Sequence, residues 1–151
     1  MNKSTIPAQS VVQTLPFNVD IGVYDYQTDE LIAHQHQHNT VLDSGLEAIW
    51  RCFTQTGPPL NGIALSSGVD GPVDGVLPNE VWRSDLSRVS VDGPILVAQF
   101  YLASSMCVGK TINSAMLLAG TIPFAFVTLD ARIKTNDEYW VIIWSFPLEA
   151  V

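Results

Sequence analysis

The feature that most constrains the fold of this sequence is a succession of short apolar segments, each followed by turn-forming residues. From Val19 onward such segments recur, separated by glycine, proline, asparagine and aspartate. Apolar runs of this length are typical of strands, and many short strands in series indicate a sandwich or barrel. We therefore expect a mainly β protein, folded as an antiparallel β-sandwich.

The pattern also places the strands. An early hairpin is expected, in which a strand from Val19 and a strand over residues 31–38 flank a polar turn at Gln27-Thr28-Asp29. A loop rich in glycine, aspartate and proline runs from Gly68 to Pro78. The later strands are expected over residues 62–66, 86–91, 95–103, 110–118, 124–129 and 139–146.

One segment has helical periodicity. Ser44-Gly45-Leu46-Glu47 has the form of a capping box, in which a serine hydroxyl and a glutamate carboxylate satisfy free backbone amides reciprocally. Gly57-Pro58 would end the helix. This predicts one short α-helix near residues 44–55. We expect its apolar stripe to pack on the core, and the stripe consists of Leu46, Ile49, Trp50 and Phe53.

The first 18 residues differ from the rest of the chain. They carry one charged residue, Lys3, and show neither a helical period nor a clean alternation. This predicts an extended N-terminal arm over residues 1–18, followed by a sandwich domain over residues 19–151. A solvated tail would not need apolar side chains, so we expect the arm to bind a partner. The partner-binding residues would be Ile6, Val11, Val12, Leu15 and Phe17. The alternative is a disordered tail without a role.

Composition and charge narrow the range of partners. Charged residues make up 15% of the chain and the net charge is −8, whereas average globular chains have about 25% charged residues. Depletion of charge favours a surface covered by neighbours, although a large β core has a similar composition. The seven basic residues are scattered, so we expect no direct binding to nucleic acid. An acidic chain is also repelled by anionic membranes.

Two further features bear on location and redox state. Residues 1–17 lack the basic-then-apolar order of a signal peptide. The most apolar run, from Ala115 to Leu129, is too short to span a bilayer. We therefore expect the chain to stay in the cytosol or in an assembly made there. Cys52 and Cys107 lie in apolar surroundings and are expected to be buried free thiols, with a single disulfide as the alternative.

A histidine cluster is the most suggestive motif for a metal. His34-Gln35-His36-Gln37-His38 would place three imidazoles on one face of a strand, with neighbours about 7 Å apart. Three side chains on a straight strand cannot surround one ion without a further ligand. We therefore expect no metal site, with an ion shared across a symmetry axis as the alternative.

Other motifs give no support to catalysis or to a cofactor. Gly109-Lys110-Thr111 resembles the end of a phosphate loop, but Ser104 stands where that motif needs glycine. We expect Lys110-Thr111 to close a hairpin instead. The spacing from Asp70 to Asp74 matches no defined calcium loop, and no acid/base pair or nucleophilic triad stands out. We therefore expect no enzymatic activity, no catalytic residue and no cofactor.

Several segments together resemble a family of phage proteins. The order of residues 39–49, 63–68, 79–83, 99–117 and 134–144 is similar to that in small virion proteins of tailed bacteriophages, and the resemblance spans residues 35–146. That family includes capsid-decorating, baseplate-associated and tail-fibre-like proteins. After the long strand, Gly109, Ile112 and Leu117 fit the family's pattern. The positions that depart from it are Val108, Ser114 and Met116.

The resemblance implies a non-enzymatic β-sandwich in a virion that is assembled in the host cytoplasm. The leading expectation is a capsid cement or decoration protein that binds the shell of the major capsid protein through its arm and its sandwich. A virion part is also expected to be a homo-oligomer. One alternative is a tail component, either a baseplate protein or a fibre-like protein. Another is a carbohydrate-binding module that uses Trp50, Trp82, Trp140 and Trp144.

Overall fold

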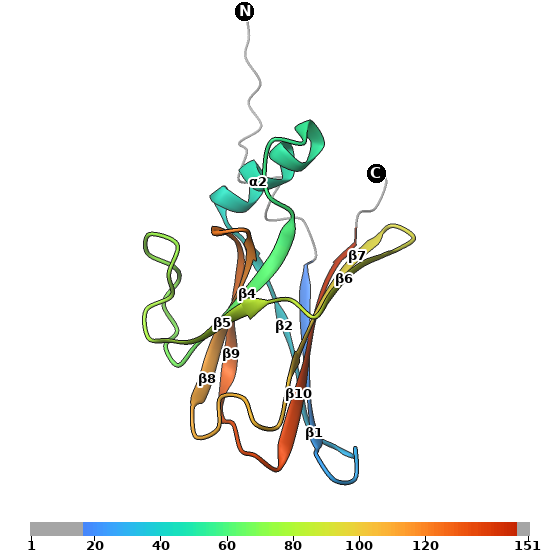
Figure 1. The fold of residues 1–151 in the computed structure, drawn as a ribbon, viewed down its shortest axis with the longest axis vertical. Coiled ribbons are helices and arrows are strands. Elements are labelled where there is room, and N and C mark those ends of the chain that lie inside the picture. The colour runs from blue at the N-terminus through green and yellow to red at the C-terminus, as the bar shows by residue number, and fades with distance from the viewer. Residues whose placement is uncertain (1–16, 148–151) are drawn as a thin grey trace, which may run out of the picture.

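The computed structural model describes residues 17–147, apart from the side chains of Cys52 and Phe53. Within these residues, ten strands form two five-stranded antiparallel sheets, and one helix lies at one end of them (Figure 1). The predicted antiparallel β-sandwich with one short α-helix is therefore confirmed.

The two sheets, called A and B, each mix strands from distant parts of the chain. Sheet A contains, in spatial order, β2 (Leu31–His38), β1 (Asn18–Asp25), β10 (Glu138–Pro147), β7 (Ile95–Leu102) and β6 (Arg88–Asp92). Sheet B contains, in the same way, β3 (Thr40–Val41), β9 (Ile122–Ile133), β8 (Thr111–Ala119), β4 (Leu60–Ser66) and β5 (Glu80–Asp85).

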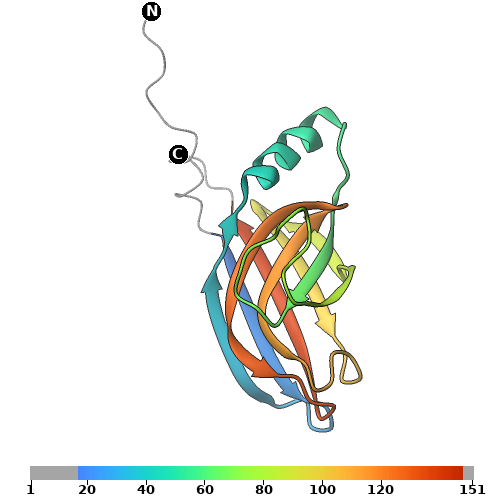
Figure 2. The same ribbon diagram turned by 90° about the vertical axis from the view of Figure 1, so that its left-hand side faces the viewer.

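The chain crosses between the sheets at both edges. Asn39 alone separates β2 from β3, and Leu86 and Ser87 alone separate β5 from β6. Figure 2 shows the first crossing, in which the chain passes from β2 directly into β3. The second crossing, from β5 into β6, includes a bend at Ser87 (Figure 1). The core is therefore enclosed by strands on both sides, with helix α2 (Asp43–Thr54) over one end.

The core follows from a strict alternation in β10, the central strand of sheet A. Glu138, Trp140, Ile142, Trp144 and Phe146 are buried, and the residues between them are partly exposed. A period of two sends alternate side chains to opposite faces of a strand. The inward face of β10 therefore supplies two fully buried tryptophans to the space between the sheets.

Strand β8 is buried almost throughout because sheet B is covered on both faces. Residues 67–79 form a loop over its outer face, where Leu77 packs with Ala64, Met116 and Leu118 in a second, smaller core. The Arg83 guanidinium helps to hold this loop by donating to the Gly75 carbonyl at 2.8 Å. A strand covered on both faces reads as a near-continuous apolar run, which explains the composition of this part of the sequence.

The helix is present, but its start differs from the prediction. The predicted capping contacts are not formed, since the Ser44 hydroxyl donates to the Pro123 carbonyl. Glu47 instead pairs with Arg51, one turn later, at 2.7 Å. The helix begins at Asp43, and its first turn is held to strand β9 by Ser44 rather than by a capping box.

The packed face of α2 also differs from the prediction. Gly45 and Ala48 are buried, and Leu46 and Ile49 are partly buried against the core. Trp50, expected in the same stripe, is 69% exposed, so that part of the prediction is wrong. The physical reason is close approach: a Cβ at Gly45 would overlap the Phe124 carbonyl, so small residues define the contact. The Phe53 side chain lies outside the described residues.

Strand β1 begins inside the predicted arm. Phe17 is 3% exposed, and its ring meets Phe146 edge-on with centroids 4.7 Å apart. The Asn39 N–H donates to the Phe17 carbonyl at 2.9 Å, and β1 begins at Asn18. The structure therefore assigns Phe17 and Asn18 to the sandwich rather than to the arm.

The remaining partner-binding residues lie outside the described residues, and their role stays a prediction. They are Ile6, Val11, Val12 and Leu15.

Two smaller expectations are also corrected. Lys110-Thr111 does not close a hairpin, because β7 and β8 belong to different sheets. The expected strand over residues 86–91 begins in a crossing, since Leu86 and Ser87 connect β5 to β6. Among the described residues, no helix is long and apolar enough to cross a membrane.

The close approach of α2 to β9 gives a first prediction. Alanine usually stabilises a helix relative to glycine, but Gly45→Ala should lower the free energy of unfolding by about 1–3 kcal/mol, because the new methyl group must displace Phe124. Urea denaturation measures the change. Gly71→Ala is the matched control, since a Cβ there would meet no atom within 4 Å. Equal stability of the two variants would contradict the packing described for Gly45.

Candidate functional site

The two ends of the sandwich carry different elements (Figure 1). One end, called the helix end, carries α2, the β6–β7 hairpin and Phe17, where the described chain begins. The other, called the turn end, carries the turns over residues 26–30, 103–110 and 134–137. The candidate sites divide between these ends and the outer face of sheet A.

The helix end is the candidate binding surface because it exposes Trp50. This side chain lies on α2 between Glu47 and Arg51, which pair with each other at the helix surface. The point where the predicted arm joins the domain lies near the start of α2, because Phe17 is hydrogen-bonded to Asn39 just before this helix begins. Tryptophan is among the residues most enriched at the centres of protein interfaces. The sequence pattern missed this exposed position because it assigned Trp50 to the core.

The outer face of sheet A carries a row of three tyrosines near the turn end. Tyr24 and Tyr139 stack with centroids 5.2 Å apart and planes inclined by 12°, and Tyr101 lies 5.3 Å from Tyr139. Gly22 leaves room for the Tyr24 ring, since a Cβ there would come within 2.7 Å of it. The row joins β1, β10 and β7, so it stiffens the centre of the sheet.

The tyrosine row is tied to the first hairpin. The Tyr139 hydroxyl donates to Asp29 Oδ1 at 3.0 Å. Desolvation and this carboxylate together raise the pKa of the Tyr139 hydroxyl above its ordinary value. The sequence pattern did not reveal this row. Its only signal was a tyrosine in each of three strands, and which strands are neighbours in the sheet cannot be read from the sequence.

The three histidines lie on one face of β2, as predicted. His34, His36 and His38 are opposite Gly22, Asp20 and Asn18 on β1. His36 Nδ1 is 2.7 Å from Asp20 Oδ1, and His34 Nε2 is 3.4 Å from the same oxygen. These contacts link the edge strand β2 to its neighbour. Among the described residues, no group of three or more histidine, cysteine, aspartate or glutamate side chains is arranged to hold a metal ion.

The histidine row gives a prediction about metal binding. We expect the purified protein to retain no stoichiometric zinc after dialysis, because the imidazoles of His34 and His36 contact Asp20 and no group of three or more ligating side chains among the described residues is arranged to hold an ion. Elemental analysis makes the measurement. About one zinc per chain, lost on His36→Ala, would show that the cluster is a metal site after all.

A buried lysine holds the turn end together. The Lys134 side chain is fully buried, and its ammonium donates to the Ser104 carbonyl at 2.9 Å and to the Thr135 carbonyl at 2.7 Å. Burial lowers the pKa of Lys134, although the neighbouring Glu138 opposes this. Because Ser104 lies in the loop after β7 and Thr135 in the turn after β9, the lysine connects the two sheets at this end.

Glu138 is the partner charge of this network. It is almost fully buried and accepts hydrogen bonds from Arg132 Nε at 3.1 Å, Thr135 Oγ1 at 2.9 Å and Trp140 Nε1 at 2.6 Å. Burial alone would raise the pKa of Glu138, but hydrogen bonds from Arg132, Trp140 and Thr135 outweigh it and lower the pKa. A carboxylate held this way stays ionised and orders the turn. Glu138 therefore has a structural role, since its carboxylate oxygens already accept hydrogen bonds from side chains of the same chain.

Glu138 gives a prediction about pH. Its pKa is lower in the folded than in the unfolded chain, so its contribution to stability is full above the unfolded value, about 4.3, and is lost as the pH falls through the folded value. Glu138→Gln should lower the free energy of unfolding at pH 7 by about 1.5–3 kcal/mol. The difference between the two proteins should shrink at pH 3. Urea denaturation at both pH values tests this, and an unchanged difference would contradict it.

The thiol of Cys107 is free and partly buried, in line with the expectation for it, while the Cys52 side chain lies outside the described residues. Burial raises the pKa of Cys107 more than Lys134 and Lys110 lower it. A thiol with a raised pKa is a poor nucleophile.

A small cavity lies between the facing edges of β2 and β9. Its volume is about 170 Å³, and its lining includes Ile21, Val23 and Ala33. Gln35 bridges the two strands at its edge by accepting from the Asp130 N–H at 2.8 Å. Pockets for small ligands usually have volumes of about 300–1,000 Å³, so this cavity is too small to serve as one.

Comparison with known proteins identifies no relative of this chain. No family model, no curated protein and no solved structure matches it. The candidate site therefore rests on the geometry of the chain itself.

Proposed function

We propose that the chain is a non-enzymatic structural protein of a bacteriophage virion, and that it acts as a capsid cement or decoration protein bound to the major capsid protein. The observation that carries this proposal is the helix end, where Trp50 is exposed on a helix whose first turn follows closely after the point at which the predicted arm joins the sandwich. The resemblance of residues 35–146 to small virion proteins supports the same assignment. A rigid sandwich with one binding end suits attachment to a shell.

The helix end and the arm would act together in attachment. Each apolar side chain of the arm contributes roughly 1.5–3 kcal/mol when buried, while ordering the backbone costs about 1–2 kcal/mol per residue. The arm therefore needs strand pairing with a partner sheet, and a rigid anchor beside it, to bind with a net gain. Trp50 supplies such an anchor because it is already held on a helix.

A tail component, either a baseplate or a fibre-like protein, is the second candidate within the same class. The copy number per particle separates the two candidates. Quantitative mass spectrometry of particles of the phage whose genome encodes the chain should find on the order of hundreds of copies for a shell protein, and tens or fewer for a tail protein. Complete absence from the particles would overturn the virion assignment.

A carbohydrate-binding module receives less support from the tryptophans. Trp140 and Trp144 are fully buried, and Trp82 is partly buried with its indole N–H donating to Ser84 Oγ at 3.0 Å. Trp50 is the one tryptophan that is largely exposed. A flat sugar platform built from several tryptophans is therefore not formed.

The exposed tryptophan gives a prediction about attachment. Trp50→Ala should weaken binding to particles by about tenfold or more, because a central aromatic anchor typically contributes about 2 kcal/mol or more. The melting temperature should change little. Tyr26→Ala is the matched control, since Tyr26 is 56% exposed at the turn end. Equal losses of particle occupancy in the two variants would argue against the helix end as the attachment site.

The arm gives a second prediction about attachment. Deletion of residues 1–15 should leave the melting temperature nearly unchanged and should severely lower occupancy on particles. Phe17 must be kept, because Phe17→Ala should lower the free energy of unfolding by about 3–5 kcal/mol through the cavity it leaves beside Phe146. If the truncated protein decorates particles fully and resists dissociation equally well, the arm is not a tether.

A further inference from the structure

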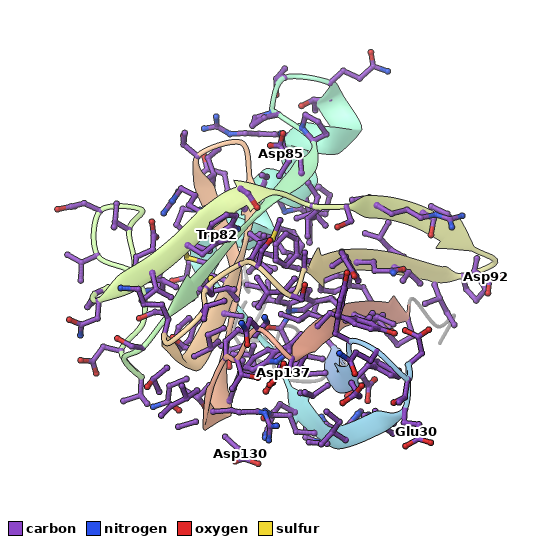
Figure 3. The ribbon with its side chains drawn as sticks, turned by 60° about the horizontal axis from the view of Figure 1, so that its bottom comes forward. Glu30, Trp82, Asp85, Asp92, Asp130 and Asp137 are labelled. Carbon is purple, nitrogen blue, oxygen red and sulfur yellow. The ribbon has the colours of Figure 1, made fainter. Side chains whose placement is uncertain are left out.

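Strand β6 ends sheet A and has one edge that no described strand covers. It pairs with β7 on one side, and it is the last strand in the order of the sheet. Four of its five residues are exposed. Figure 3 shows Asp92 at the outer end of the β6–β7 hairpin, which projects from the helix end of the molecule. Its unpaired edge is therefore accessible to another chain.

The face of β6 that lies on the same side of sheet A as the core is apolar, yet it is exposed. Val89 and Val91 lie opposite Ala98 and Leu96 of β7, which face the core. Val91 is nevertheless 73% exposed and Val89 40% exposed. Exposed β-branched residues on an open edge strand are typical of a surface that pairs with a further strand.

The turn of the hairpin determines which backbone groups of β6 face outward. Gly93-Pro94 is a two-residue loop, and Gly93 has φ 58°, as the first position of a type II′ turn requires. In such a hairpin the flanking residues, Asp92 and Ile95, form a hydrogen-bonded pair. The pattern alternates along the strand, so the N–H and C=O groups of Val89 and Val91 point to the open edge.

The sequence of this edge is self-complementary. Strand β6 reads Arg88-Val89-Ser90-Val91-Asp92. We propose that it pairs antiparallel with β6 of a second copy of this chain, about a two-fold axis at Ser90. This register joins the two copies of sheet A into one continuous sheet.

Backbone hydrogen bonding selects this register. It places Val89 opposite Val91 of the second copy, and Val91 opposite Val89, so all four outward N–H groups and carbonyls find partners. If the register shifted by one residue, the outward N–H and C=O groups of one copy would lie opposite residues of the second copy whose backbone groups are already bonded to β7. A shift by two residues would leave one valine of each copy without its partner.

The charges select the same register. Arg88 falls opposite Asp92 of the second copy at one end, and Asp92 falls opposite Arg88 at the other. Opposite charges directly across a strand pair stabilise it, whereas like charges destabilise it. Edge strands that avoid pairing often carry charged side chains, especially lysine. The opposite signs at the two ends of β6 instead favour pairing with an identical strand.

This inference does not depend on the proposed virion role, because it rests on the geometry and charges of β6 alone. It names the surface through which the expected homo-oligomer would form. A two-fold contact of this kind uses the same surface on both copies, so the assembly that it forms is a dimer.

Charge reversal tests the pairing directly. In sedimentation experiments over a range of concentrations, the full-length protein should form dimers. Arg88→Asp and Asp92→Arg should each weaken dimerisation by about tenfold or more, because each places like charges opposite one another at both ends. An equimolar mixture of the two variants should recover dimers, since every position then faces its opposite charge. The double variant should also dimerise with itself.

Two controls separate pairing from misfolding. Val91→Pro removes an outward N–H that β7 does not use, so it should block dimers while leaving the melting temperature close to that of the parent. Glu30→Arg makes the same charge change as Asp92→Arg at the turn end and should leave dimerisation unchanged. A parent that stays monomeric at every concentration overturns the proposal. So does a dimer that survives both single reversals, or a mixture that fails to recover dimers.

Discussion

The burial of one face of β10 is the interaction on which the rest of the structure depends. This strand lies at the centre of sheet A, and Trp140 and Trp144 fill the space between the sheets from its inner side. The same face ends in Phe146, which receives Phe17, and begins with Glu138, which holds the turn end. The alternate residues on the inner face of β10 therefore connect the core to both ends of the molecule.

The two ends differ in how they are held together, since a buried polar network lies at the turn end and a helix packs at the other. At the turn end, the buried Lys134 and Glu138 are hydrogen-bonded to groups of the same chain, while Tyr26, Val108 and Ile133 are exposed there. At the helix end, Trp50 and the apolar side of β6 are exposed. Both proposed contacts, to a shell and to a second copy, use the helix end.

Sequence reasoning was accurate where a side chain's environment follows from local periodicity. The first hairpin, the histidine row and most strands were located because alternate residues on a strand face opposite sides. It failed where close packing between distant segments decided the outcome. Trp50 is exposed because Gly45 rather than Trp50 meets Phe124, and Phe17 is buried because Phe146 lies beside it. The Lys134 and Glu138 network was missed because charged residues are usually solvated.

The sequence by itself determined the fold class, since the alternation of apolar residues and the turn residues between them admit few other arrangements. It also contained the self-complementary order of β6, from Arg88 to Asp92. Only the tertiary structure decided that this strand lies at an open edge, and that its valines project beyond the core. The physical reason is that pairing partners in an antiparallel sandwich come from distant parts of the chain. Whether an edge or a side chain is covered therefore depends on contacts that no local pattern records.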